Sequence, residues 1–460
     1  MKTWNGQRVL ILGAARQGLA LARFLSRCGA VVTLSDQKPP EQMSAIQQAL
    51  GDAPQVSLAL GGHPLSLLDT ADVLCLSGGI PLSLPIVFEA QRRGIPISND
   101  SQIFMEVVPC RVIGITGSAG KTTTTTLVGR MAEAAVDAPH KAWVGGNIGL
   151  PLIDYLDQID AGDTVILELS SFQLEQMTFS PQVAAILNIT PNHLDRHGTM
   201  QVYIAAKTRI LAYQTEFDTA VLGYDDPAAW GLAGQVHGKL ISFGFDQPQK
   251  GKTGTFCQSG HLYLQDGATV TELMDQADIL LRGQHNLLNV LAACAIACAA
   301  GFPVEAMRKG VIGFKGVPHR LEFVRQYGGA DWYNDSIATA PERSMAAIHS
   351  FSEPLVLLLG GRDKNLPWQD LTDLIHQRVD HVVVFGEAAE KILAALGQVE
   401  SGKRPFTISR CQGLQEAIHA AAAVIEPGDV VLLSPGGTSF DEFIDFEQRG
   451  ERFQLWVNQL

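Results

Sequence analysis

The stretch VIGITGSAGKTTTTT (residues 112–126) decides the fold of the central part of this 460-residue chain. An apolar, strand-forming run is followed by a turn with two glycines, a lysine and five threonines. This order is typical of a phosphate-binding loop, because the N–H groups at a helix N-terminus attract anions. The usual pattern G-x-x-x-x-G-K-[ST] is not met, since Ile115 stands where its first glycine belongs.

The physical parts of a nucleotide site are nevertheless present in this tighter loop. Gly117 and Gly120 permit positive φ and a close approach of the backbone to a phosphate. Lys121 can neutralise phosphate charge, and the Thr122 hydroxyl can bind Mg²⁺. The residues expected to hold ATP here are Gly117, Ser118, Ala119, Gly120, Lys121, Thr122 and Thr123. The alternative is an ordinary glycine turn before a helix.

Composition limits what the remainder of the chain can be. Hydrophobic residues make up 46% and charged residues 18%, which predicts a packed globular protein. The net charge of -13 argues against nucleic-acid or anionic-membrane partners, which need a basic surface. The apolar stretch VLAACAIACAA (residues 290–300) is too short to span a membrane and predicts a buried helix.

Two further features predict a cytoplasmic protein. The opening MKTWNGQRVLILG leads directly into a strand, without the pattern of a secretory signal. The seven cysteines are scattered, odd in number and without a CxxC pair, as expected for a reducing compartment.

Strands alternate with helical stretches along the chain, which predicts an α/β protein with parallel sheets. We divide it into three domains: a Rossmann-like domain at 1–100, a central P-loop-type ATPase domain at 101–315, and a Rossmann-like, doubly wound domain at 316–460. In the last of these we expect four strands, each followed by a polar or glycine turn.

The first domain supports a competing interpretation. GAARQG (residues 13–18) lacks the middle glycine of G-x-G-x-x-G, because Ala15 occupies that position. Asp36 lies at a spacing that fits a ribose hydroxyl. An NAD-dependent oxidoreductase is therefore one alternative, and a noncatalytic nucleotide-binding protein is another.

Three residues beyond the loop can carry chemistry. Glu168 ends an apolar strand, where a buried carboxylate needs a partner such as Mg²⁺ or a basic side chain. His193 follows another strand, although a lone histidine is more often structural than a metal ligand. By composition, Lys207 is a surface lysine near the end of a long helix.

Residues 114–123, GITGSAGKTT, resemble the ATP loop of the Mur ligases, and motifs in the same order extend the resemblance over essentially the whole chain. The resemblance is strongest to the branch that adds glutamate to UDP-N-acetylmuramoyl-L-alanine in peptidoglycan synthesis. A relative that adds L-glutamate remains an alternative. Folylpolyglutamate synthase shares the ATP loop, but the N-terminal UDP-type domain argues against it.

The resemblance implies roles for residues that the sequence alone leaves open. Thr122, Glu168, His193 and a carbamylated Lys207 would hold two Mg²⁺ ions, and Lys121 would complete the catalytic set. The adenosine and phosphates of ATP would contact Asn286, Asn289, Arg320 and Asp335, although Asn286 can equally cap a helix. The expected substrate contacts are Arg16, Gln17, Asp36, Lys38 and Ser77 for the UDP end, Asn147 and Ser170 nearer the reacting carboxylate, and Thr339, Lys364, Ser439, Phe440 and Phe446 for glutamate.

Two departures from the family concern the glutamate pocket. Ile337 stands where the family often has lysine, and Arg362 and Asp363 in GGRDK also differ. The resemblance implies that ATP phosphorylates the substrate carboxylate, that glutamate's amine attacks the acyl phosphate, and that the domains close for the reaction. No residue is identified as a general base, and we expect a monomer.

Overall fold

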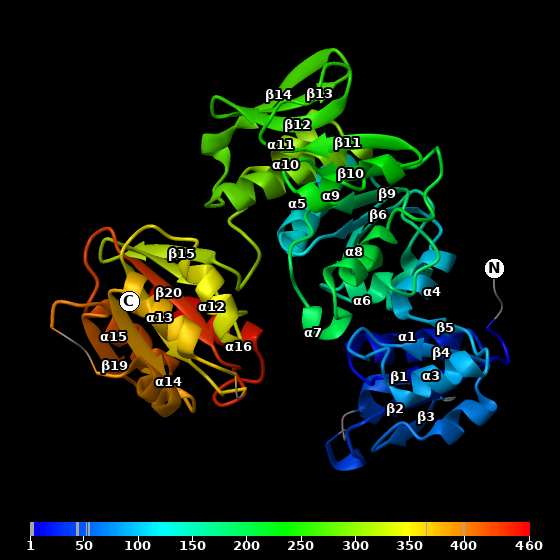
Figure 1. Ribbon diagram of the computed structural model, residues 1–460, viewed down its shortest axis with the longest axis horizontal. Helices are drawn as coiled ribbons and strands as arrows, with labels where there is room; N and C mark the ends of the chain where they lie inside the picture. Colours follow the sequence, from blue (N-terminus) through cyan, green and yellow to red (C-terminus); the bar gives the residue numbers. More distant parts are fainter. Residues whose placement is uncertain (1–3, 43–45, 52, 54–55, 365, 399–400) are drawn as a thin grey trace. The chain divides into compact units, whose positions relative to one another are not determined.

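The computed structural model describes residues 4–42, 46–51, 53, 56–364, 366–398 and 401–460. Within these residues three mainly parallel sheets contain five, nine and six strands (Figure 1). The chain forms two compact units. Unit 1 is Met1–Ile279 with Gln284–Ile312, and unit 2 is Leu280–Gly283 with Gly313–Leu460. The predicted α/β class is confirmed, whereas the domain boundaries near residues 100 and 315 stay predictions.

The first sheet of unit 1 has the strand order β3-β2-β1-β4-β5, with all neighbouring strands parallel. The elements are β1 (Arg8–Leu12), α1 (Arg16–Arg27), β2 (Val31–Asp36), α2 (Ile46–Leu50), β3 (Val56–Leu60), β4 (Val73–Leu76), α3 (Pro85–Arg92), β5 (Ile97–Ser98) and α4 (Asp100–Val107). This is the predicted Rossmann-like unit. The edge strand β3 was not predicted, because its side chains are mostly half-buried and form no continuous apolar run.

The second sheet of unit 1 has the order β14-β13-β12-β11-β10-β9-β6-β8-β7. Its strands are β6 (Arg111–Thr116), β7 (Ala142–Gly146), β8 (Thr164–Glu168), β9 (Val183–Ile186), β10 (Thr219–Gly223), β11 (Lys239–Phe243), β12 (Thr253–Gln258), β13 (His261–Asp266) and β14 (Thr269–Asp275). Only the β12–β13–β14 edge is antiparallel. Since β6 lies between β8 and β9, the loops after these three parallel strands meet at one edge of the sheet.

The helices of this domain are α5 (Lys121–Ala135), α6 (Ser171–Leu174), α7 (Leu194–His197), α8 (Met200–Thr208), α9 (Pro227–Trp230), α10 (Gln284–Ala299) and α11 (Val304–Val311). The predicted buried helix is confirmed as α10, whose residues 289–297 are buried. The five consecutive threonines at 122–126 all lie in α5, and Thr123, Thr124 and Thr125 are buried. Tertiary packing therefore outweighs their weak helix propensity.

Unit 2 contains the strand order β15-β16-β20-β17-β18-β19, in which only the β15 edge is antiparallel. Its elements are β15 (Glu322–Tyr327), β16 (Ala330–Asn334), α12 (Pro341–Ile348), β17 (Leu355–Gly360), α13 (Gln369–Arg378), β18 (His381–Phe385), α14 (Ala389–Leu396), β19 (Thr407–Arg410), α15 (Leu414–Ala422), β20 (Val430–Gly436) and α16 (Phe446–Gln459). The four predicted strands are β16, β17, β18 and β20. The edge strands β15 and β19 were missed because neither contains a buried residue.

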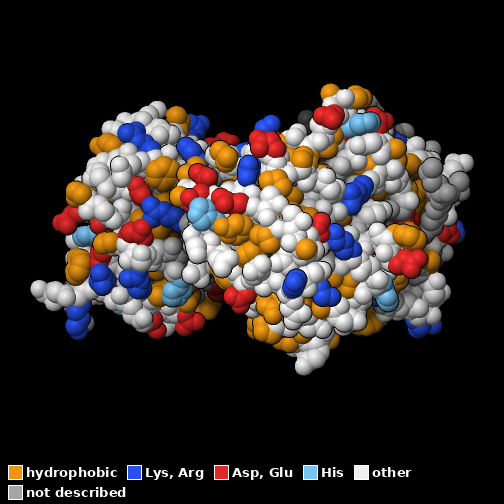
Figure 2. Space-filling model, turned by 90° about the horizontal axis from the view of Figure 1, so that it is seen from above, with side chains coloured by type: hydrophobic (Ala, Val, Ile, Leu, Met, Phe, Trp, Pro, Cys, Tyr) orange, Lys and Arg blue, Asp and Glu red, His pale blue; other side chains and the backbone are white. Residues whose placement is uncertain are grey.

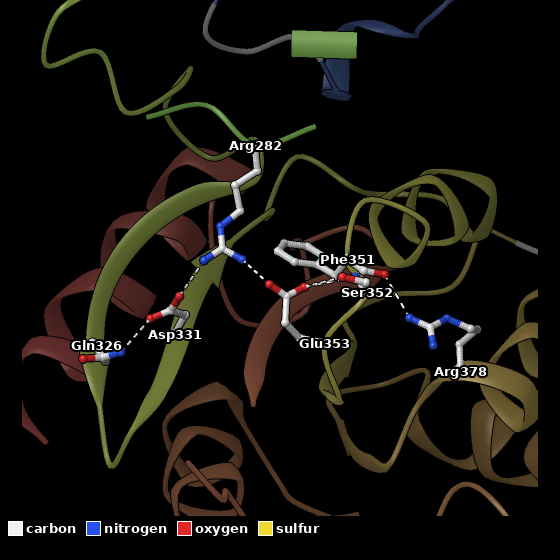
Figure 3. A network of polar contacts seen from close by, with 7 residues as sticks. All are labelled: Arg282, Gln326, Asp331, Phe351, Ser352, Glu353 and Arg378. Carbon is white, nitrogen blue, oxygen red and sulfur yellow. Dashed lines mark hydrogen bonds and ion pairs between the residues drawn. The ribbon is translucent and has the colours of Figure 1, made fainter. Parts of the chain in front are cut away.

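Arg282 explains why the short segment Leu280–Gly283 clusters with unit 2. Its guanidinium lies between Asp331 and Glu353 (Figure 3), at 2.8 Å from the Asp331 carboxylate. It also lies over the Tyr333 ring, 5.4 Å from the centroid. The segment immediately before α10 is thus held by charge and ring contacts to the sheet of unit 2.

Among the described residues, no helix is long and apolar enough to cross a membrane. On the face drawn in Figure 2, basic and acidic side chains are interspersed with hydrophobic ones. Both signs of charge therefore reach the surface on that face.

Candidate active site

The loop between β6 and α5 approaches its neighbours too closely for larger side chains. Gly120 has φ of +80° at the N-cap of α5, and a Cβ atom there would lie 2.2 Å from Oδ1 of Asn289. Gly117 does not adopt the positive φ that a glycine permits. Position 117 has no room for a side chain, because a Cβ atom on Gly117 would lie 2.9 Å from the Cβ atom of Leu187. Both glycines thus let the loop pack tightly.

Lys121 is folded back over this loop. Its Nζ donates to the carbonyl oxygen of Gly117 at 2.9 Å and to that of Ser118 at 3.3 Å. The Ala119 N–H donates to Oδ1 of Asn188. The loop therefore carries a cation and an exposed helix N-terminus at one place, which is the chemistry that a phosphate needs.

Glu168 at the end of β8 is only 1% exposed and is held by two donors. Oγ1 of Thr122 donates to one carboxylate oxygen at 2.8 Å, and Nδ2 of Asn147 donates to the other at 2.8 Å. The structure thus brings together three predicted site residues, from the start of α5, the loop after β7 and the end of β8. Ser170, also predicted, caps the following helix α6 by accepting the Gln173 N–H.

The Thr122 hydroxyl and the Glu168 carboxylate are hard oxygen donors, which suit Mg²⁺. His193 is exposed, has left-handed φ of 53° and packs on Phe172, with ring centroids 5.2 Å apart. Among the described residues, no group of three or more His, Cys, Asp and Glu side chains is placed to hold a metal ion. A metal here would need mixed donors such as the threonine hydroxyl.

Lys207 is buried, so its interpretation as a surface lysine of a long helix is wrong. It lies near the end of the nine-residue helix α8 and is 1% exposed. Its Nζ donates to the carbonyl oxygen of Gly117 at 2.9 Å and to Oγ1 of Thr116 at 3.3 Å. Burial, reinforced by the charge of Lys121, lowers the pKa of Lys207 to about 7. The helical stretch looked exposed because α8 is short and has little apolar periodicity.

A cavity of about 220 Å³ lies beside the loop, within unit 1. Gly120, Asn289 and His285 line it, and Asn289 donates to Oδ1 of Asn286 at 3.1 Å. Asn286 does not cap the helix, because α10 already begins at Gln284. Sequence reasoning missed the other lining residues, which include Asn188, Asp225, Asp226 and Phe243. They come from separate loops, so no local pattern joins them.

At the end of the first sheet, the two Asp36 oxygens accept the N–H groups of Ala14 (2.8 Å) and Lys38 (2.9 Å). This carboxylate therefore fixes the loop after β1. Gln17 donates to the Gly146 carbonyl oxygen at 2.9 Å and joins the loop of Asn147. The remaining predicted residues are Arg16 and Lys38, both exposed, and Ser77, which is buried.

In unit 2, Asp335 follows β16 and is 5% exposed. It accepts the Ser434 hydroxyl at 2.8 Å and the Leu321 N–H at 3.2 Å. Burial raises the pKa of Asp335 to about 7. Lys364 donates to Oγ1 of Thr339 at 3.3 Å. These predicted residues therefore lie beyond the carboxyl ends of β16 and β17, the two strands that flank β20.

The other predicted residues of unit 2 differ in exposure. Ser439 is buried, Phe440 is 59% exposed, and the Phe446 ring packs edge-on against His319. Arg320 is half-buried. Sequence reasoning missed Arg449, which is fully buried.

The Arg449 guanidinium donates to the hydroxyl and carbonyl oxygens of Ser336 and to the Gly437 carbonyl oxygen. Its contacts hold the loops after β16 and β20 together. Burial lowers the pKa of Arg449 to about 10. Arg449 lies among other polar residues at the start of α16, so the local sequence gave no sign of this role.

Comparison with known proteins gives one consistent result along the chain. Residues 7–99 match the model "Mur ligase MurD-like, N-terminal domain". Residues 115–297 match "Mur ligase middle domain", and residues 319–437 match "Mur ligase, glutamate ligase domain". The three matches follow the three sheets.

Two full-length relatives carry the same name. The UDP-N-acetylmuramoylalanine--D-glutamate ligase of Koribacter versatilis is 40% identical over 99% of this chain and 98% of its own length. The ligase of the same name from Acetivibrio thermocellus is 37% identical over 100% of this chain and 98% of its own.

Solved structures support the fold at lower identity. The UDP-N-acetylmuramate-alanine ligase MurC of Thermotoga maritima aligns over 98% of this chain and 99% of its own, with a TM-score of 0.55 and 18% identity. The MurF ligase of the same organism, solved with ADP, aligns over 100% of both chains with a TM-score of 0.55 and 18% identity. These structures establish the three-domain α/β fold.

Proposed function

The chain belongs to the Mur ligase family, and from that premise we propose that it joins D-glutamate to UDP-N-acetylmuramoyl-L-alanine at the expense of ATP, in peptidoglycan precursor synthesis. The observation that carries the proposal is full-length identity of about 40% to ligases of that name, over 98% or more of both chains. The site of unit 1 supports it, because a phosphate loop and a buried carboxylate meet at one sheet edge.

The chemistry follows from the low reactivity of a carboxylate toward amines. A carboxylate oxygen of the muramoyl-alanine substrate attacks the γ-phosphorus of ATP, and the bond to ADP breaks. The amine of glutamate then attacks the carbonyl carbon, phosphate leaves, and the amine loses a proton. Lys121 and the N–H groups at the start of α5 stabilise the phosphate charge during transfer. The chain's task is otherwise to place the amine in line with the carbonyl carbon.

Thr122 and Glu168 would hold Mg²⁺, with His193 and a carbamylated Lys207 as further ligands. Bound Mg²⁺ would screen the negative charges of the phosphates and the substrate carboxylate as they approach. Hydrogen bonds from Thr122 and Asn147 hold the Glu168 carboxylate in position for this role.

The environment of Lys207 supports the carbamate. A pKa of about 7 leaves much of the amine neutral near neutral pH, and only a neutral amine attacks CO₂. The Lys207 ammonium first loses one proton. The neutral amine then forms an N–C bond with CO₂ and loses a second proton, which leaves an anionic carbamate as an oxygen donor. In ¹³C-bicarbonate buffer we expect a carbamate carbon signal from the wild-type protein and none from K207A. Wild-type protein without this signal, but fully active after CO₂ removal, would contradict the carbamate.

The remaining sites complete the assignment. The cavity beside Gly120 would take the adenine of ATP, and the loops after β1, β2 and β4 would take the UDP end of the substrate. Unit 2 would supply Arg320 and Asp335 to the nucleotide, and Thr339, Lys364, Ser439, Phe440 and Phe446 to glutamate. We propose a cytoplasmic monomer with domain boundaries near residues 100 and 315.

A turnover assay with each glutamate enantiomer tests the function. We expect phosphate release to require ATP, Mg²⁺, UDP-N-acetylmuramoyl-L-alanine and D-glutamate together, with a product heavier by one glutamate residue. Turnover with L-glutamate alone would identify the L-adding alternative. ATP binding without product from either enantiomer would contradict the ligase proposal.

A further inference from the structure

The loop after β16 and the first turn of α12 place two cations on either side of Thr339. The Ile337 carbonyl oxygen accepts the Thr339 N–H at 2.9 Å and Nη1 of Arg343 at 3.1 Å. The Thr339 hydroxyl accepts Nζ of Lys364 at 3.3 Å. Arg343 and Lys364 are therefore joined through one short stretch of backbone, although they are 21 residues apart in the chain.

Neither cation is neutralised by an ion pair with any described residue. The nearest acids act only at longer range, Asp335 and Glu342 on Arg343 and Glu342 on Lys364. Asp335 offers little compensation, because burial raises its pKa to about 7. The site thus holds more positive than negative charge.

Repulsion among the cations of this site adds to the excess of positive charge. Although Arg343 reaches the surface, loss of water around its guanidinium and the charge of Arg320 lower its pKa. Loss of water, Arg343 and Arg449 lower the pKa of Lys364. An external anion would relieve this repulsion, and two cations can receive two anionic groups.

Arg343 has more N–H donors available for a ligand than Arg449 has. A guanidinium carries five N–H donors. Within the described residues, Arg343 makes one side-chain hydrogen bond, to the Ile337 carbonyl oxygen, and its side chain is exposed. Arg449 is fully buried, and all three of its guanidinium nitrogens already donate to loop oxygens. Arg343 is therefore the guanidinium that a soluble ligand can reach.

We propose that Arg343 binds one carboxylate of the incoming amino acid while Lys364 and Thr339 bind the other, so that Arg343 selects a dicarboxylic amino acid. This inference rests on the proposed function and adds a specificity-determining residue to it. It also accounts for Ile337, since Arg343 brings a positive charge to the backbone of the position where the family often has lysine.

The test compares R343M with wild type by calorimetric titration of D-glutamate into protein saturated with ADP and UDP-N-acetylmuramoyl-L-alanine. This measurement needs no turnover. Losing a charge-assisted contact should weaken the Kd for glutamate by roughly 10-fold or more, while the Kd for ADP changes less than about twofold. R410M, which removes an arginine paired with Glu390 on the surface of unit 2, is the matched control and should bind both ligands normally.

A second arm moves the charge instead of deleting it. In I337K/R343M, a lysine from position 337 should recover most of the lost glutamate affinity, a result that a merely structural role of Arg343 would not give. An unchanged Kd for glutamate in folded R343M would overturn the inference. A weakened Kd for ADP alone would overturn it too, because the cation would then serve a phosphate. Wild-type turnover is measured separately, so either result leaves the proposed ligase function to its own test.

Discussion

The phosphate loop of unit 1 and the cation pair of unit 2 are both proposed to bind anions, but their positive charges are held differently. Lys121 donates to two carbonyl oxygens of its own loop. Arg343 and Lys364 contact a single short segment, and the charge of Arg343 helps to lower the pKa of Lys364. The first site is organised by its backbone, whereas the second remains electrostatically incomplete without a ligand.

This difference predicts where substitutions act. A preorganised site contributes most where charge develops during the reaction, so damage there should lower kcat. A site completed by its ligand contributes to ground-state binding, so damage there should appear in KM. The following predictions test this division.

The largest effect is expected from K121A. Removing the only side-chain cation of the loop should lower kcat by roughly 10³-fold, because transferred phosphate charge loses its stabilising partner. Product formation with saturating substrates measures it. K250A, which removes an exposed lysine of unit 1, should retain wild-type kcat. If K121A raised only KM for ATP, the loop would be a binding site like that of unit 2.

G120A should be the next most damaging change. The new Cβ atom would lie 2.2 Å from Oδ1 of Asn289, and the left-handed φ adds strain of about 1–2 kcal/mol. We expect a lower melting temperature and a higher KM for ATP. G251A has φ of +85° and no atom within 4 Å, so it isolates the strain alone. Equal losses of stability in the two variants would contradict the close packing at Gly120.

The features that could be predicted from the sequence are each encoded within a short continuous stretch of residues. The buried strands of unit 2 are continuous apolar runs, and the loop before α5 has its glycines, lysine and threonine in one order. Glu168 was recognised because a carboxylate at the end of an apolar strand is unusual.

The features that it missed depend on tertiary contacts. Lys207 is buried because α8 packs beneath the phosphate loop, and nothing within the helix records that. The side chains around the 220 Å³ cavity meet only after the sheet forms. Gly117 has ordinary φ, since its constraint is the side chain of Leu187 on a neighbouring strand end.

D335N tests whether unit 2 carries an unfavourable buried charge. Since burial raises the folded-state pKa of Asp335 to about 7, the unfolded chain releases this proton first as pH rises. Ionisation of Asp335 should therefore lower the free energy of unfolding of the wild-type protein progressively from about pH 4 to pH 7. Above that range its effect should stay constant. The melting temperature of D335N relative to wild type should rise over that range. D373N removes an exposed carboxylate of α13 as a control, and a pH-independent difference for D335N would contradict the prediction.

R282M should have the smallest effect on stability. This variant also tests whether the proposed anion sites of unit 1 and unit 2 are independent. Arg282 pairs with Asp331 and Glu353 from a partly exposed position, so its loss should cost about 0.5–1 kcal/mol, or a few degrees of melting temperature. R362M, which breaks a single exposed pair with Glu387, should cost less.

The KM for ATP in R282M decides the larger question. Arg282 precedes α10, whose Asn289 lines the cavity that we propose for the nucleotide, yet its contacts are to unit 2. An unchanged KM with a lowered melting temperature would show that Arg282 only anchors the segment. A higher KM would show that the nucleotide cavity of unit 1 depends on an ion pair made in unit 2, and the two anion sites could then no longer be treated as separately organised.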